Sequence, residues 1–180
     1  MRKGTVAAIL ALLMALLCAT AWAEETMKSG DYEYRVLDDG TAEITKYSGK
    51  DETLEVPAVL DGRSVTRIGD GAFSCCDSLT SLTLPDSVTE IGDYAFGDCI
   101  ELTSVTLPDS VTEIGDYAFS WCTSLSSITL PSSVESIGKE AFANCPNLTL
   151  TVPRDSYAAS YAKENGIPYE YPDSHDWLND

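Results

Sequence analysis

The chain has 180 residues and a formal net charge of −18 at pH 7, from 29 acidic and 11 basic side chains. Between Arg67 and Lys139 there is no Lys or Arg at all. Proteins bind nucleic acids and anionic membranes by neutralising negative charge, so this balance excludes both as partners. The acidic surface either keeps an extracellular protein soluble or attracts basic partners or divalent cations.

Residues 1–23 have the pattern of a secretory signal peptide. Arg2 and Lys3 precede an apolar run at 6–17, and small residues at Ala21 and Ala23 supply a cleavage site. The apolar run is shorter than the roughly 20 residues that a membrane helix needs. We therefore expect cleavage after Ala23, secretion of the mature protein and no membrane insertion. Retention at the cell surface is left open.

The next segment, 24–51, is predicted to be an N-terminal hairpin cap. Two alternating segments at 32–37 and 41–45 flank the turn sequence Asp38-Asp39-Gly40. Alternating segments around such a turn are a β-hairpin signal.

A repeat of 23 residues fills the stretch 52–153. Four residue types recur at this spacing: Ile68, Ile91, Ile114 and Ile137; Phe73, Phe96, Phe119 and Phe142; Cys76, Cys99, Cys122 and Cys145; Leu79, Leu102, Leu125 and Leu148. A fixed period in this range indicates a solenoid, in which each unit buries its apolar face against its neighbours.

One repeat predicts a short strand and a tight turn. The spacing of Leu102, Val105 and Leu107 fits a strand that Pro108 ends. The segment 116–119 fits a single helical turn with its Asp as N-cap. Stacked copies thus predict an α/β solenoid with a parallel sheet on one face and short helical or 3₁₀ turns on the other.

The string LPDSVTEIGDYAF, followed three residues later by Cys, resembles the consensus of the BspA-type leucine-rich repeats of bacterial surface and secreted proteins. The resemblance covers about 52–153. It implies a right-handed, horseshoe-like leucine-rich-repeat coil that acts in adhesion or protein binding without catalysis. It also implies a bacterial, host-associated source.

Residues 154–171 are predicted to form a helical C-terminal cap, because 156–165 has good helix formers between a Ser and Gly166. The last stretch, 172–180, reads as a flexible acidic tail. It holds His175, the chain's one histidine. Catalytic dyads and metal sites need histidines held by a scaffold. We therefore expect no enzyme activity, no cofactor and no metal site.

Five cysteines would remain after cleavage. The four at 23-residue spacing are predicted to stack as buried thiols, because parallel Cβ directions make the dihedral angle of a disulfide between coils awkward. Cys75 precedes this ladder and is expected to face outward as an accessible thiol. We expect a monomer, with a dimer linked through Cys75 as the alternative.

Two surfaces are candidate binding sites. Side chains between the inward strand residues point outward, and they form the columns Ser81, Ser104 and Ser127; Thr83, Thr106 and Thr129; and Asp86 and Asp109. The second surface carries Tyr94, Tyr117 and Trp121. Ser and Thr also simply suit an exposed strand. The aromatic residues either stack on a ligand or shield the junctions between coils.

These features predict a secreted or cell-surface protein-binding or adhesion module with an acidic surface. Its expected partner is an extracellular protein with a basic surface, for which host matrix is a candidate. One alternative is a carbohydrate-recognition module that uses Tyr94, Tyr117 and Trp121. Another is a structural spacer within a larger secreted assembly.

Overall fold

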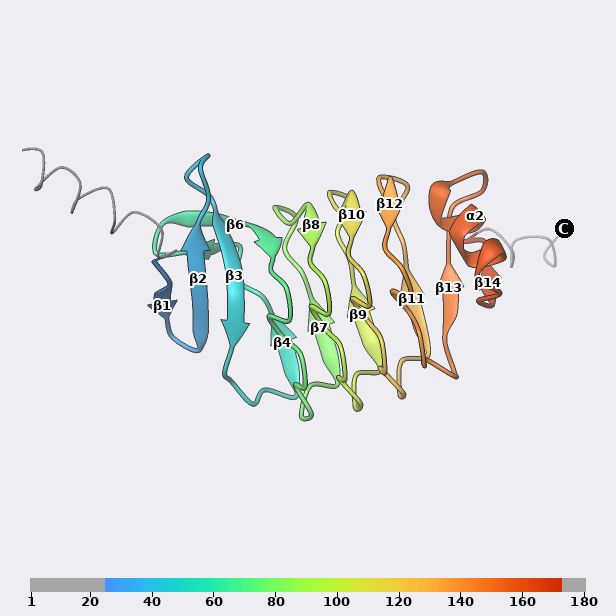
Figure 1. Ribbon diagram of the computed structural model, residues 1–180, viewed down its shortest axis with the longest axis horizontal. Helices are drawn as coiled ribbons and strands as arrows, with labels where there is room; N and C mark the ends of the chain where they lie inside the picture. The colour runs from blue at the N-terminus through green and yellow to red at the C-terminus, as the bar shows by residue number, and fades with distance from the viewer. Residues whose placement is uncertain (1–24, 173–180) are drawn as a thin grey trace, which may run out of the picture.

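The computed structural model describes residues 25–172, which form a β-solenoid capped at both ends. Figure 1 shows the coils side by side along the long axis, between an N-terminal hairpin and a C-terminal helix. The predicted solenoid fold, with a parallel sheet on one face, a hairpin at the N-terminus and a helix at the C-terminus, is confirmed. The expected signal peptide at 1–23 and all but the first residue of the expected tail at 172–180 lie outside the described residues.

One side of the solenoid is a six-stranded parallel sheet, here called the face sheet. Its strands are β4 (Thr53–Glu55), β7 (Ser81–Thr83), β9 (Ser104–Thr106), β11 (Ser127–Thr129), β13 (Thr149–Thr151) and β14 (Tyr169–Glu170). Equal repeat positions pair, as in Leu82 with Val105. These central residues are buried, so the two flanking residues of each strand point outward.

The opposite side is an eight-stranded sheet, here called the back sheet. Its strands are β1 (Met27–Ser29), β2 (Tyr32–Val36), β3 (Ala42–Tyr47), β6 (Arg63–Ile68), β8 (Glu90–Ile91), β10 (Glu113–Ile114) and β12 (Ser136–Ile137), with β5 (Val59–Leu60) paired to β6. The antiparallel pair of β2 and β3 is the predicted N-terminal hairpin, and β3 pairs parallel to β6. The hairpin therefore continues the back sheet and covers the first coil.

The repeats contain a sheet where the sequence predicts helical turns. The Ala-Phe segments are successive turns that lead from the back sheet to the face sheet. Tyr94, Tyr117 and Trp121 adopt φ angles of 54°, 56° and 61°. Left-handed residues interrupt a right-handed helix, so these segments stay turns. The predicted N-cap is also wrong, because the Asp116 carboxylate accepts from Lys139 N of the next coil at 2.6 Å.

The core is organised around a column of aromatic rings. Tyr47 of the hairpin stacks on Phe73 with ring centroids 5.2 Å apart. The column continues through Phe96 and Phe119 to Phe142 at centroid spacings of 5.2, 5.1 and 5.5 Å. Each ring thus covers its neighbour's face and excludes water from the middle of the stack.

The C-terminal cap contains the helix α2 (Tyr157–Glu164). Its N-cap is Ser156, whose Oγ accepts from Ala159 N at 3.1 Å, as the sequence predicts. The helix buries Ala158, Tyr161 and Ala162. Their burial holds the helix over the end of the solenoid.

Candidate functional site

Many recurring polar side chains bind neighbouring coils rather than solvent. The Ser of each Leu-Pro-x-Ser string donates to a Val carbonyl of the preceding coil: Ser87 to Val65 at 2.6 Å, Ser110 to Val88 at 2.5 Å and Ser133 to Val111 at 2.6 Å. These hydroxyls are already paired, so they do not form part of a binding surface.

A column of aspartates next to the back sheet also forms hydrogen bonds between neighbouring coils. Asp70 Oδ1 accepts from Asp93 N at 2.9 Å, and Asp93 Oδ1 accepts from Asp116 N at 2.7 Å. A carboxylate that accepts backbone N–H groups contributes to stacking of the coils. The acidic residues beside the tyrosines are therefore structural.

The outward-pointing Thr and Ser columns of the face sheet make the fewest hydrogen bonds to neighbouring coils. Thr83, Thr106 and Thr129 are exposed, and their hydroxyls make no hydrogen bond within residues 25–172. The Ser column is partly self-paired, because Ser104 Oγ donates to Ser81 Oγ at 3.1 Å. Ser104 and Ser127 are exposed and Ser81 is half-buried. The Thr column is therefore free to contact a ligand.

Asp86 and Asp109 lie just beyond the C-terminal ends of strands β7 and β9 of the face sheet. Both are exposed, and neither carboxylate has a hydrogen-bond or ion-pair partner among the described residues. An unpaired, hydrated carboxylate is available to a basic partner. The face sheet thus combines free hydroxyls with free negative charge.

The aromatic candidates lie on a different side of the molecule, in the turns between the two sheets. Tyr94 and Tyr117 stack with centroids 4.9 Å apart and an interplanar angle of 10°. The next coil places Lys139 Nζ 5.9 Å from the Tyr117 ring centroid. Both faces of Tyr117 are therefore covered, which leaves Trp121, 52% exposed, and the outer face of Tyr94. The candidate residues therefore lie on two separate surfaces.

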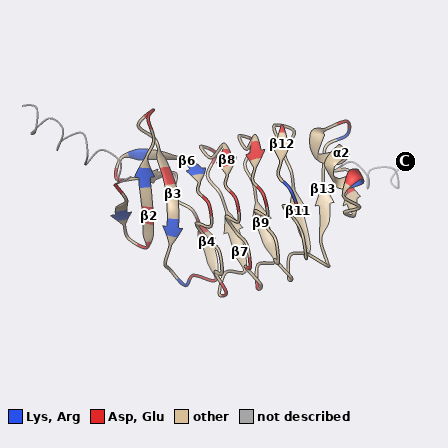
Figure 2. Cartoon of the chain, in the orientation of Figure 1, with Lys and Arg blue, Asp and Glu red and all other residues tan. Residues whose placement is uncertain are grey.

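Charge is divided along the solenoid. Figure 2 shows most Lys and Arg residues on the N-terminal strands, whereas Asp and Glu dominate the repeats. Where the two regions meet, Arg67 forms an ion pair with Glu90. Beyond this pair, the acidic repeats have no nearby basic residue until Lys139.

Within residues 25–172, no three His, Cys, Asp or Glu side chains converge to hold a metal ion. The same part of the chain has no helix with the length and apolar character to cross a membrane.

All five described cysteines are free thiols. The Sγ–H groups of Cys99, Cys122 and Cys145 donate to the carbonyls of Phe73, Phe96 and Phe119 at 3.1, 3.2 and 3.1 Å. Cys99 and Cys122 are buried as predicted. Cys76 and Cys145 are only half-buried, contrary to the prediction, because they end the ladder and a repeat covers them on one side only.

Ionisation of the ladder thiols differs with position. Burial raises the pKa of Cys122 to about 12 and that of Cys145 to about 11. A hydrogen bond with the Cys99 thiol lowers the pKa of Cys76 and raises that of Cys99. Cys75 is exposed, with φ 57°, and its thiol faces outward as predicted.

We expect a native thiol titration at pH 8 to give one fast group, because a reagent reaches an exposed thiol first. Cys75→Ser should abolish this phase, and Cys76 should react next. Cys99 and Cys122 should react only after unfolding. A fast phase that survives Cys75→Ser would contradict this assignment, and mass spectrometry of the labelled peptides identifies the residue responsible.

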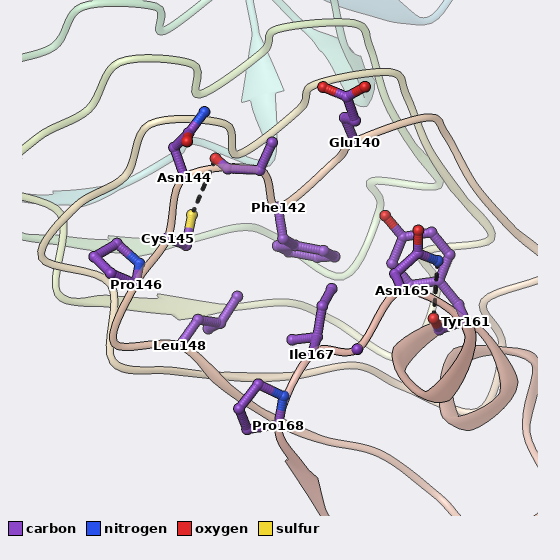
Figure 3. Close-up of a pocket in the computed structure, with 12 residues that line it drawn as sticks. Glu140, Phe142, Asn144, Cys145, Pro146, Leu148, Tyr161, Asn165, Ile167 and Pro168 are labelled. Atoms are coloured by element: carbon purple, nitrogen blue, oxygen red, sulfur yellow. Dashed lines mark hydrogen bonds between the residues drawn. The ribbon is translucent and has the colours of Figure 1, made fainter.

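The sequence did not indicate a pocket that lies between the last Ala-Phe turn and the C-terminal cap. It has a volume of about 360 Å³, and its walls include Phe142, Cys145, Leu148, Tyr161 and Ile167 (Figure 3). The only signal in the sequence is Ile167 directly after the helix stop at Gly166. An apolar residue at that place belongs either to the cap's own packing or to a pocket wall.

The family model for the BspA-type leucine-rich-repeat region matches residues 51–161 with six copies of the repeat. The chain belongs to this family. No curated protein matches the chain at a significant level.

Solved structures of bacterial leucine-rich-repeat proteins share the fold. One from Bacteroides capillosus is 34% identical, with a TM-score of 0.65, over 72% of this chain and 99% of that one. The T. pallidum leucine-rich-repeat protein is 30% identical, with a TM-score of 0.57, over 72% of each chain. A leucine-rich cell surface protein from Faecalibacterium prausnitzii is 27% identical, with a TM-score of 0.69, over 86% of this chain and 41% of that longer one.

Proposed function

We propose that this chain is a non-catalytic, secreted or cell-surface module that binds an extracellular protein through its face sheet. The observation that carries the proposal is the column of exposed, unpaired Thr hydroxyls beside unpaired Asp86 and Asp109. A rigid, repetitive surface with free polar groups suits recognition of another macromolecule. The similar Faecalibacterium protein is a leucine-rich cell surface protein, which supports the proposed location.

The partner we propose is a protein with a basic surface. The repeats carry negative charge without basic residues between Arg67 and Lys139, so they attract positive charge over the length of the acidic region. Host matrix proteins with basic patches are the first class to test. A panel of purified matrix proteins, probed with the protein by surface plasmon resonance, identifies a partner.

Association with such a partner should slow as salt is added. The Debye length shrinks from about 30 Å at 10 mM to about 8 Å at 150 mM salt, which screens attraction between separated charges. We expect the association rate constant to fall by about tenfold over this range, while the dissociation rate changes little. Association kinetics that stay flat over this range would exclude electrostatic steering.

Two substitutions locate the surface. Asp109→Lys and Thr106→Arg should each weaken binding of the matrix partner at least tenfold. Glu135→Lys makes the same charge change as Asp109→Lys at an exposed position outside the face-sheet columns. It should reduce the association rate only slightly. Equal losses in all three variants would place the contact elsewhere.

Carbohydrate recognition is the second candidate, and exposed Trp121 beside the tyrosine stack favours it. An exposed indole offers an apolar face on which a sugar ring can pack. A glycan array with the protein and its Trp121→Ala variant tests this candidate. Signals that vanish in the variant support it, and failure of both the array and the matrix panel leaves the structural spacer.

A further inference from the structure

The C-terminal cap covers two sides of the last coil and leaves the third open. β14 extends the face sheet, with Leu150 N donating to Pro168 O at 2.8 Å and Val152 N to Glu170 O at 2.9 Å. Helix α2 packs over the end of the back sheet, where Tyr161 Oη donates to Gly138 O at 3.4 Å. The turn at 140–145 between the two sheets forms the wall of the pocket in Figure 3.

This open turn ends three columns of backbone hydrogen bonds. In the preceding coil, Tyr117 N donates to Lys139 O at 2.9 Å. Phe119 N and Trp121 N donate to Ala141 O and Ala143 O, each at 2.8 Å. The corresponding donors of the last coil are the N–H groups of Glu140, Phe142 and Asn144. None of these three has an acceptor within the described part of the chain. They form a row of alternating donors like the edge of a sheet.

The column of aromatic rings also ends here. Phe142 has Phe119 stacked on one face at 5.5 Å. Beyond Phe142, the Tyr161 ring is 6.3 Å away and tilted by 68°, so it meets Phe142 edge-on instead of stacking. The side chains of Leu148, Ile167 and Pro168 also line the pocket next to Phe142 (Figure 3). Phe142 itself is only 5% exposed, so the pocket begins beside the end of the column and its apolar walls are mainly Leu148, Ile167 and Pro168.

We propose that this pocket binds an extended segment of a partner protein that carries an aromatic side chain. Alternating carbonyl oxygens of the segment accept from the N–H groups of Glu140, Phe142 and Asn144, and its ring packs against the apolar pocket walls of Leu148, Ile167 and Pro168. The inference rests on the proposed protein-binding function but uses a different surface.

The interior of the solenoid identifies the occupant. At each earlier coil, an Ala-Phe segment accepts from the same three donors and stacks its phenyl ring on the column. A peptide main chain supplies carbonyls at alternating residues, as in recognition by strand addition. Sugars offer no such row of acceptors with an attached aromatic ring.

A second copy of this chain does not offer the required segment. Its first Ala-Phe turn is already covered by the hairpin, since Tyr47 N donates to Ala72 O at 2.8 Å and the Tyr47 ring stacks on Phe73. Head-to-tail stacking would have to displace this cap. Residues 173–180 of the chain itself are the remaining candidate, and the experiment distinguishes them.

Amide hydrogen exchange of the free, ¹⁵N-labelled full chain is the first measurement. The amides of Glu140, Phe142 and Asn144 should exchange at least 100-fold faster than those of Tyr117, Phe119 and Trp121. Protection that disappears when residues 173–180 are deleted, or when the protein is diluted, would overturn the proposal. It would show that the chain's own end or a second copy already occupies the pocket.

The second measurement adds a synthetic peptide with the sequence Asp-Tyr-Ala-Phe-Ser-Trp, copied from residues 116–121. Amide resonances of Glu140, Phe142 and Asn144 should shift, and replacing the peptide's Phe by Ala should weaken binding at least tenfold. Ile167→Trp, which fills the pocket, should weaken binding to the same extent. Ile100→Trp, at a 43% exposed site outside the pocket, should leave it unchanged.

Absence of shifts up to millimolar peptide, or shifts confined to the face sheet, would overturn the proposal. The peptide result is independent of the matrix partner. Thr106→Arg should weaken the matrix interaction at least tenfold and leave peptide binding intact. If the wild-type protein binds the peptide but none of the matrix proteins, the proposed function is refuted and the proposed peptide-binding pocket is not.

Discussion

Phe96→Ala is expected to lower the free energy of unfolding by about 4 kcal/mol, because it removes a fully buried ring and leaves a cavity. Phe96 stacks on Phe73 and on Phe119 at 5.2 and 5.1 Å, so the substitution breaks the aromatic column on both sides. Stability in a solenoid is shared between neighbouring coils. The loss should therefore appear in urea unfolding of the whole protein followed by circular dichroism.

Tyr94→Ala is the matched control, since it removes a ring that also stacks on the next coil, at 4.9 Å. Tyr94 is 49% exposed, so we expect a loss of only about 1 kcal/mol. Similar losses in the two variants would mean that ring stacking, and not burial, holds the coils together.

The period of 23 residues was sufficient to predict the stack, because contacts between coils join equal positions of successive repeats. Ile, Phe, Cys and Leu recur at this spacing, and all four types form buried or half-buried columns. The N-terminal hairpin and the C-terminal helix were predictable for another reason. Each has local signals, the Asp38-Asp39-Gly40 turn and the Ser156 N-cap, that do not depend on the repeat.

The back sheet was not predictable in the same way. Its repeat strands, such as Glu90–Ile91, have two residues and are too short to show alternation. The left-handed turns were also hidden, since Tyr94 and Tyr117 stand at a position where glycine would be the usual signal. Gly71, with φ 62°, occupies that position in the first full repeat and was the available hint.

The sequence indicates which residue types line the candidate site, but not which of their hydroxyl groups lack a hydrogen-bond partner. Thr83 and Ser87 are both small hydroxyl residues; Thr83 ends β7 and Ser87 lies in the turn that follows it. Ser87 donates to Val65 O, whereas Thr83 faces solvent without a partner. Which of two similar hydroxyls is free depends on the direction of the side chain relative to the preceding coil. A sequence read one repeat at a time does not contain that direction.

The same reasoning applies to the pocket at the C-terminal end. Each coil supplies the same donors, and only the shape of the cap decides which remain open. The cap extends the face sheet and covers the back sheet, so the donors of the connecting turn remain unpaired. Function in this protein is therefore expected where the repeat is interrupted or where its side chains have no partner in the next coil.

Gly115→Ala is expected to destabilise the protein by about 3 kcal/mol through overpacking. A Cβ atom at Gly115 would lie 2.6 Å from the Gly92 carbonyl carbon and 2.7 Å from Asp93 N. These are backbone atoms of the preceding coil, which hydrogen bonds hold in place, including Gly115 N to Ile91 O at 2.8 Å. The same Cβ would contact Asp93 Oδ1, which accepts from Asp116 N. The coils must separate, or the aspartate column must break.

Gly97→Ala is the control. Gly97 lies in the turn of the preceding coil, and its substitution is expected to change the free energy of unfolding in the opposite direction. A Cβ there would lie 3.3 Å from Tyr94 O and 3.6 Å from Ser120 Oγ, close to ordinary contact distances. Other repeats carry Ser74, Ser120 and Ala143 at this position, so the turn accepts a side chain. Because alanine restricts the unfolded chain, we expect stabilisation of about 0.5 kcal/mol. Urea unfolding of both variants measures the difference, and tolerance of Gly115→Ala would show that neighbouring coils are not packed backbone to backbone at this column.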